Sequence, residues 1–264
     1  MQNYINIVLS SKGGVGKTVI ATFLYEYLIA KKKQKTVILN TDTSNKDLQE
    51  STWYRSVFVD FKDDSGVITP KKLTELTEKF GTKNLVIDVG ANSYYPWITF
   101  LSQMDGVAEL ELFGAKVILH VVLVGGTQFG ETVKCLQEIC NLKLPVEIVV
   151  HLNNGFAEDS SYYLPNPLEI ATKPEIEPYT SQIKTFIPLP ECRVIEKDTF
   201  DTIKKLHLSL SEIADADLET QKRLASPNAL QNDNRVKIFK ARSIRYREKV
   251  FNALKALDVY YDVK

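Results

Sequence analysis

The sequence predicts an α/β protein with a doubly wound, mostly parallel sheet and helices on both of its faces. Short apolar runs of strand length alternate along the chain with segments of helical periodicity. A glycine-rich turn joins the first apolar run to the first helical segment. With 264 residues the chain is long enough to bury one sizeable core, and we expect a single domain over residues 1–264.

The predicted elements follow this alternation. Residues 4–9 form the first strand and residues 18–30 the first helix, which is followed by three lysines that suit the negative end of a helix dipole. Pro70 suits the first position of a helix that ends before Gly81. The other predicted strands are residues 36–39, 56–61, 85–88, 116–124, 146–152 and 185–189, and a further helix is predicted over residues 127–140.

The second half of the chain departs from this pattern in two places. Residues 154–182 contain four prolines and scattered Ser and Tyr, and they predict a long surface loop. Residues 234–258 carry apolar side chains at three- and four-residue steps, which predicts one long amphipathic C-terminal helix.

Composition excludes several classes of protein. The 33 basic and 33 acidic residues balance, so contact with nucleic acid or with a membrane would need a local patch. Three cysteines are too few and too badly spaced for a disulfide framework or a zinc site. The sequence begins with no signal peptide and contains no transmembrane segment, so we expect a cytoplasmic protein, with recruitment to the membrane or the nucleoid left open.

The glycine-rich turn has the chemistry of a phosphate-binding loop. Its glycines allow backbone N–H groups to face an anion, and the following helix adds positive potential at its N-terminus. We expect Lys17 to contact the β- and γ-phosphates of ATP, and the Thr18 hydroxyl to bind Mg²⁺. The alternative is a turn that merely links strand to helix. If the loop does bind phosphates, GTP would suit it as well as ATP. The loop consists of Lys12, Gly13, Gly14, Val15, Gly16, Lys17 and Thr18.

This loop resembles the deviant Walker A motif of the ParA/MinD family of P-loop ATPases, although Ser11 stands where the common pattern has glycine. The resemblance implies that Lys12 reaches the phosphates of a partner subunit in a nucleotide-sandwich homodimer. A cation supplied by the partner stabilises the transition state only when two subunits meet, so hydrolysis would depend on dimerisation.

Two strand-end carboxylates extend the resemblance. Asp42 matches the second aspartate of the family's Asp-x-Asp-Pro motif, which positions the attacking water near Mg²⁺, whereas Asn40 and Thr43 depart from that motif. Asp88 ends an apolar strand in the Walker B manner and would bind Mg²⁺ directly or through water. For both carboxylates the alternative is a structural role in a turn.

Asn153 matches an asparagine with which the family contacts adenine, and Pro188 and Pro190 lie where the family packs the other side of the base. Asn153 is followed by Asn and Gly, so a simple turn is the equal alternative. The histidines, among them His120 and His151, look isolated and ordinary.

The order of segments 85–93 and 120–127, followed by Pro188 and Arg193, resembles the TraL-type proteins of conjugative plasmid transfer. This resemblance implies an accessory ATPase of conjugation or type IV secretion that works with a DNA-transfer machinery. The alternatives are a partition ATPase that binds DNA non-specifically, a MinD-like ATPase recruited to the membrane, and a nucleotide-binding scaffold without turnover.

The predicted C-terminal helix carries a basic face over residues 235–249. Such a face could contact DNA or an anionic membrane, and a solvated helix face is the alternative. Only Glu248 opposes its basic residues, which are Arg235, Lys237, Lys240, Arg242, Arg245, Arg247 and Lys249.

Overall fold

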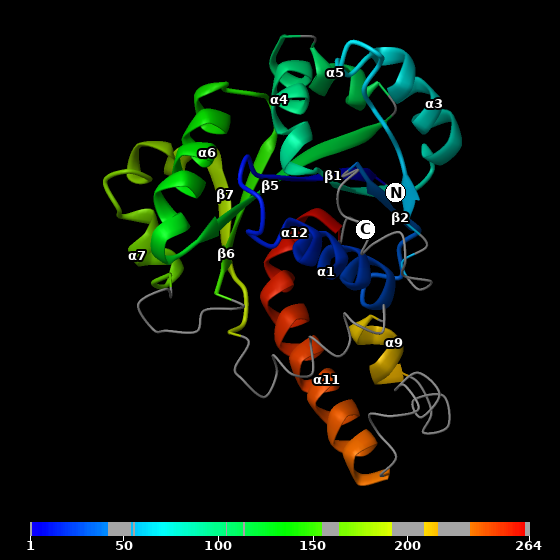
Figure 1. Ribbon diagram of the computed structural model, residues 1–264, viewed down its shortest axis with the longest axis vertical. Helices are drawn as coiled ribbons and strands as arrows, with labels where there is room; N and C mark the ends of the chain where they lie inside the picture. Colours follow the sequence, from blue (N-terminus) through cyan, green and yellow to red (C-terminus); the bar gives the residue numbers. More distant parts are fainter. Residues whose placement is uncertain are drawn as a thin grey trace.

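The computed structural model describes residues 2–41, 54, 56–103, 105–112, 114–154, 164–191, 209–215 and 233–261. Its centre is a seven-stranded sheet in which all strand pairs are parallel, in the order β3-β2-β4-β1-β5-β6-β7 (Figure 1). The strands are β1 (Asn3–Leu9), β2 (Thr36–Asn40), β3 (Val57–Phe58), β4 (Asn84–Asp88), β5 (Ala115–Val124), β6 (Glu147–Asn153) and β7 (Ile183–Pro188). The predicted doubly wound parallel sheet is therefore confirmed.

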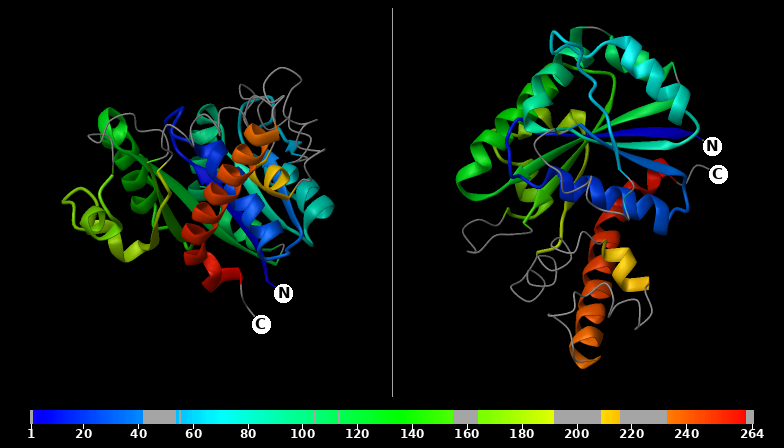
Figure 2. Two further views of the ribbon diagram at one scale, coloured as in Figure 1. Left: turned by 90° about the horizontal axis from the view of Figure 1, so that it is seen from below. Right: turned by 45° about the vertical axis from the view of Figure 1, so that its right-hand side comes forward.

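Helices cover both faces of this sheet (Figures 1 and 2). One face carries α1 (Lys17–Ala30), α9 (Leu210–Asp215), α11 (Asp233–Leu254), η5 (Lys255–Leu257) and α12 (Asp258–Tyr261). The other helices are α3 (Pro70–Phe80), η1 (Ala91–Ser93), α4 (Tyr94–Gln103), α5 (Gly106–Glu111), η2 (Gly126–Gln128), α6 (Phe129–Asn141), α7 (Pro167–Ala171) and η4 (Glu177–Gln182), and the core of the second face draws on this set.

Strand β1 shows how the sequence divides the core between the two faces. Successive side chains of a strand point to opposite sides. Ile5, Ile7 and Leu9 accordingly pack with the helices of the second face, whereas Tyr4 and Val8 pack with α1 and the C-terminal helices.

The order of the strands places a binding site at the end of β1. The connection after β1 leads through α1 toward β2, whereas the connection after the neighbouring β5 leads through α6 toward β6. Two adjacent parallel strands whose connections diverge leave a crevice at their carboxyl ends, and ligands of doubly wound proteins bind there.

Some elements differ from the sequence prediction. The strand expected over residues 56–61 is only Val57–Phe58, and the chain then forms an antiparallel bridge between Lys62 and Ile68. Two short helical elements, α7 and η4, lie within the stretch for which we predicted a surface loop. Helices α4 and α5 had not been predicted, although the buried residues of α4, among them Trp97, Phe100 and Leu101, follow three- and four-residue steps.

The long C-terminal helix is present as α11, which has 22 residues. Its last turns are buried against α1 through Tyr246, Val250 and Leu254, whereas its N-terminal end projects from the body beside α9 (Figure 1). None of the described helices combines the length and the apolar character that a membrane span requires.

A buried carboxylate on α1 holds α9 in place. Glu26 is 2% exposed and accepts hydrogen bonds from the backbone N–H groups of Leu210 (3.2 Å) and Ser211 (2.9 Å) and from the Tyr54 hydroxyl (2.9 Å). Burial raises the pKa of the Glu26 carboxyl, although these hydrogen bonds act in the opposite direction. The Glu26 carboxylate thus supplies acceptors for the first N–H groups of α9, which have no partner within their own helix.

The two core histidines are not isolated, as the sequence suggested, but joined in one polar network. His120 Nδ1 lies 2.9 Å from His151 Nε2, and His120 Nε2 lies 3.0 Å from Asn6 Oδ1, which also accepts from the Tyr261 hydroxyl at 2.6 Å. The Asn6 amide donates to the Leu85 carbonyl, so its oxygen must face the histidine. His120 therefore donates through Nε2 and accepts from His151 through Nδ1, which leaves His151 Nδ1 as an acceptor without a partner among the described residues.

Candidate functional site

The glycine-rich loop lies between the carboxyl end of β1 and the first turn of α1. Gly14 (φ 74°) and Gly16 (φ 95°) have left-handed backbone conformations that are costly for other residues. Val15 between them is buried and fixes the loop to the core. The helix begins at Lys17 directly after Gly16, so its first N–H groups face the loop.

Lys17 lies along this loop. Its side chain is largely buried, because the residue is 7% exposed, and its Nζ donates to the Lys12 carbonyl at 2.8 Å. The ammonium group is thus held within the turn, where we expect phosphates.

Thr18 and Asp88 meet at the site although 70 residues separate them. The Thr18 hydroxyl donates to Asp88 Oδ2 at 2.7 Å, and Asp88 is 1% exposed at the end of β4. Thr41, directly after β2, lies beside this pair. Its N–H (3.1 Å) and its hydroxyl (2.9 Å) both donate to the backbone carbonyl of Asp88. The ends of β2 and β4 and the start of α1 therefore converge on one point.

Asn153, at the end of β6, contacts the loop from the other side. Its side-chain amide donates to the Val15 carbonyl at 2.8 Å. A Cβ added to Gly16 would overlap this amide nitrogen, so the glycine is required by space as well as by conformation. Pro188 is paired in register with Leu152 and thus lies beside Asn153, and Pro190 follows two residues later.

Lys12 points toward α6. Its Nζ lies 2.7 Å from Glu131 Oε2 in the first turn of that helix, and the two side chains are 41% and 57% exposed. Both groups are therefore accessible to solvent, and the pair lies at the rim of the loop.

The arrangement fits a nucleotide with a magnesium ion. Side chains added at Gly13 or Gly14 would meet open space, so this face of the loop leaves room for an anion. Backbone N–H groups, a helix N-terminus and the Lys17 ammonium supply the donors that phosphate needs. The Thr18 hydroxyl and the Asp88 carboxylate supply hard oxygen ligands of the kind that Mg²⁺ prefers.

Other predicted site residues fall outside this cluster. Asp42, Thr43 and Arg193 lie outside the described residues, so the structure does not place them. Two residues of the cluster escaped the sequence analysis. Glu131 carries no local signal, since one acid in the first turn of a helix is common, and Thr41 could have been noticed only as the neighbour of Asp42.

No protein-family model matches the chain. Two Escherichia coli proteins called TraL are 30% identical to it, one over 155 and the other over 154 residues, which is 56% of this chain. The chain spans only 62% of the length of these relatives.

Several solved structures show lower similarity. An ATP complex of Cyanothece McdA has a TM-score of 0.47 at 12% identity and covers 97% of this chain and 96% of its own. A ParA family ATPase from Chlorobium tepidum TLS has a TM-score of 0.44 at 11% identity, with coverage of 92% and 98%. A plasmid partition protein from Borrelia burgdorferi has a TM-score of 0.40 at 15% identity, with coverage of 78% and 98%.

The TraL matches agree with the resemblance that the motifs predict, and the loop geometry agrees with it independently. Over 56% of its length the chain is similar to proteins called TraL, and this similarity supports the ParA/MinD-like, TraL-type resemblance.

Proposed function

We propose that this protein binds ATP with Mg²⁺ and hydrolyses it, and that the ATP-bound form is a homodimer. The observation that carries the proposal is the 2.7 Å hydrogen bond from Thr18 to Asp88 beside a loop with the conformation of a phosphate cradle. A hydroxyl and a buried carboxylate in this position would supply two of the six ligands of a magnesium ion. The residue roles given below belong to the same proposal.

Each described residue would have a defined task. The N–H groups of the loop and the Lys17 ammonium would hold the phosphates and stabilise the charge that develops on them. Thr18 and Asp88 would hold Mg²⁺, which supplies further neutralisation of phosphate charge when bound. Thr41 would hold the backbone of Asp88 in place, because the Thr41 hydroxyl donates to the backbone carbonyl of Asp88. Thr41 also precedes Asp42 in the sequence, which supports the proposal that Asp42 orients the attacking water.

Lys12 would act on the partner's nucleotide. Its present partner, Glu131, forms an exposed ion pair, and such pairs contribute about 1 kcal/mol or less. The lysine can therefore leave Glu131 for a phosphate of higher charge at little cost, which is compatible with a role across a dimer interface.

At the level of the cell, we propose an accessory ATPase of conjugative transfer, because the matched relatives are TraL proteins. It would act in the cytoplasm with components of the transfer machinery. A partition ATPase that binds DNA is the second candidate, and exposed basic side chains on α11, such as Lys237 and Arg245, favour it.

The test is calorimetric titration with ATP and Mg²⁺, together with measurement of phosphate release. Lys17→Ala should weaken ATP binding by about 10²-fold, because a charge-assisted contact is lost. Asp88→Asn keeps the size of the side chain, and it should abolish the increase in affinity that Mg²⁺ gives to wild-type protein.

Lys134→Ala on α6, which removes an exposed lysine, is the control and should behave as wild type. Wild-type ATP affinity in Lys17→Ala would overturn the proposed nucleotide site. ATP binding without any phosphate release by the wild-type protein, tested with DNA as a stimulant, would leave a nucleotide-binding scaffold as the function.

A further inference from the structure

Lys12 is held at three points in this structure. Its N–H donates to Ser10 Oγ at 3.3 Å, its carbonyl accepts from Lys17 Nζ at 2.8 Å, and its ammonium lies 2.7 Å from Glu131 Oε2. The first two contacts fix the backbone of the loop, whereas the third fixes the end of the side chain. The position of the Lys12 ammonium therefore depends on a residue of another element, α6.

Glu131 belongs to a part of α6 that is firmly attached to the sheet. The next residue, Thr132, is buried, and its hydroxyl accepts from the Val124 N–H at the end of β5 at 3.3 Å. Val133 is buried in the core of the second face. The long side chain of Lys12 has far more rotational freedom than this braced turn. Glu131 is thus the fixed member of the pair, and Lys12 is the member that can move.

The place of Glu131 in its helix does not by itself explain the ion pair. An acid in the first turn of a helix is favoured by the helix dipole, whether or not it has a cationic partner. Glu109 has the same place in α5, and within the described part of the chain no ion pair involves it. Lys12 and Glu131 meet because the phosphate loop follows β1 and the start of α6 follows β5, which is the parallel neighbour of β1.

This pair competes with the use of Lys12 by a second subunit. If Lys12 kept Glu131 while it approached a partner's nucleotide, the carboxylate would be brought against phosphates of the same sign of charge. The pair must therefore open before the lysine acts across the interface. Opening one exposed pair changes an equilibrium constant by about fivefold at most. A symmetric dimer opens two such pairs, so the combined effect reaches about 25-fold.

We propose that Glu131 restrains Lys12 and thereby limits formation of the ATP-bound homodimer. This inference rests on the proposed function, since it names a control on the dimer described there. ATP would weaken the restraint from within the loop. Its phosphates would draw Lys17 away from the Lys12 carbonyl, because a charged acceptor binds an ammonium more strongly than a carbonyl does. The backbone that carries Lys12 would then be released once its own site is occupied.

The experiment measures dimerisation of the full chain with a non-hydrolysable ATP analogue and Mg²⁺, by sedimentation equilibrium. Glu131→Gln keeps the size of the side chain and removes its charge. We expect the dimer dissociation constant to fall by about 5- to 25-fold. The affinity of the monomer for the analogue should stay that of the wild type. Phosphate release should rise at low protein concentration and converge with the wild type at high concentration, because only assembly is restrained.

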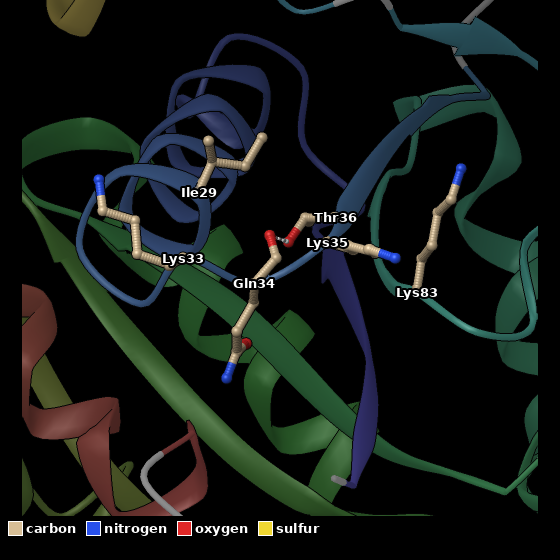
Figure 3. Close-up of a pocket in the computed structure, with 6 residues that line it drawn as sticks. All are labelled: Ile29, Lys33, Gln34, Lys35, Thr36 and Lys83. Carbon is tan, nitrogen blue, oxygen red and sulfur yellow. Dashed lines mark hydrogen bonds between the residues drawn. The ribbon is translucent and has the colours of Figure 1, made fainter.

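Three further variants serve as controls. Glu109→Gln removes the first-turn glutamate of α5 and should leave the dissociation constant unchanged. Lys12→Ala combined with Glu131→Gln should stay as monomeric as Lys12→Ala alone, because the restraint then has nothing to hold. Lys35→Ala removes an exposed lysine that lies directly before β2, at the opposite end of the strands from the phosphate loop. Figure 3 shows its side chain directed away from Lys33, and this variant should dimerise like the wild type.

An unchanged or weaker dimer in Glu131→Gln would overturn the restraint. Dimerisation of the double variant would overturn it as well, because the gain would then come from relief of repulsion between subunits. Tighter binding of the analogue by Glu131→Gln monomers, with no change in dimerisation, would assign Lys12 to the nucleotide of its own subunit. If neither wild type nor Glu131→Gln dimerises although both bind ATP, the dimer of the proposed function fails together with the restraint, and the nucleotide site stands.

Discussion

At the scale of single residues, Asn153 and Gly16 are adapted to each other. The Asn153 amide donates to the Val15 carbonyl at 2.8 Å, and only a residue without a side chain fits at position 16 beneath it. The same asparagine was predicted from family resemblance to contact adenine. The structure shows that this side chain braces the phosphate loop from β6, and the adenine contact stays a prediction.

Asn153→Ala should separate these two tasks. If the side chain braces the loop, its loss should weaken ATP and GTP binding by the same factor, about five- to tenfold for one buried hydrogen bond. Asn153→Asp should weaken both further, because a carboxylate would face the Val15 carbonyl and the phosphates. The measurement is calorimetric affinity for each nucleotide, with Asn154→Ala as the neighbouring control, since Asn154 bonds to Leu164 instead. A loss confined to ATP would indicate a base contact and no bracing role.

At the scale of elements, a polar ladder crosses the middle of the sheet. Asn6 of β1, His120 of β5 and His151 of β6 are bonded in a row, and Tyr261 of α12 joins the end of the row at Asn6. All four residues are buried, so the ladder ties the last helix of the chain to the first strand. Burial lowers the pKa of His151 to about 3 and that of His120 well below its ordinary value.

This ladder should make the fold sensitive to acid. The unfolded chain binds protons on these histidines below about pH 6.5, whereas the folded chain does not, so stability should fall as the pH decreases from 6.5 toward 3. At pH 4.5 one such histidine accounts for about 3 kcal/mol. Glu26 acts in the opposite direction, because its raised pKa favours the folded state as pH falls.

Urea unfolding between pH 7 and pH 4.5 measures this dependence. His151→Gln keeps a donor for His120 and should flatten the decline in stability, with little change near pH 7. An unchanged slope in this variant would show that other groups control the acid response.

Helix α11 raises a second prediction at this scale. Lys237 and Arg245 are exposed and Arg242 is half-buried, whereas Arg247 is bonded to Asp215 at 2.9 Å with a side chain only 13% exposed. If the exposed residues contact DNA phosphates, retention of duplex DNA in the presence of ATP should weaken steeply with salt. Reversal of Lys237, Arg242 and Arg245 to Glu should then abolish it. The control is reversal of Lys71, Lys134 and Lys143. Equal loss in both sets, or no retention by the wild type at low salt, would remove DNA from the proposed partners.

At the scale of the whole molecule, Lys12 links the phosphate loop to the proposed dimer. Its ammonium lies at the rim of the loop with Glu131, and Lys17 already serves the loop from within. A second cation at this site is useful if it acts on another subunit. The proposed dimer would bring two such rims together and supply each site with a lysine that it lacks.

Complementation between variants tests this use. Lys12→Ala should bind ATP as a monomer but fail to dimerise with a non-hydrolysable analogue, as measured by light scattering. Asp42→Ala should bind ATP and hydrolyse it about 10²-fold more slowly. Mixing the two should restore part of the hydrolysis, because one site of the mixed dimer has both Asp42 and a partner's Lys12. If Lys12→Ala loses ATP affinity as severely as Lys17→Ala and mixing restores nothing, Lys12 acts within its own subunit.

The sequence by itself determined the features that local patterns encode. Buried parallel strands appear as short apolar runs, the phosphate loop as glycines between a strand and a helix, and α11 as a three- and four-residue periodicity, and each is present in the structure. Only the tertiary structure decided which distant residues meet. Thr18 with Asp88, Lys12 with Glu131, and His120 with His151 are each joined by packing between separate elements.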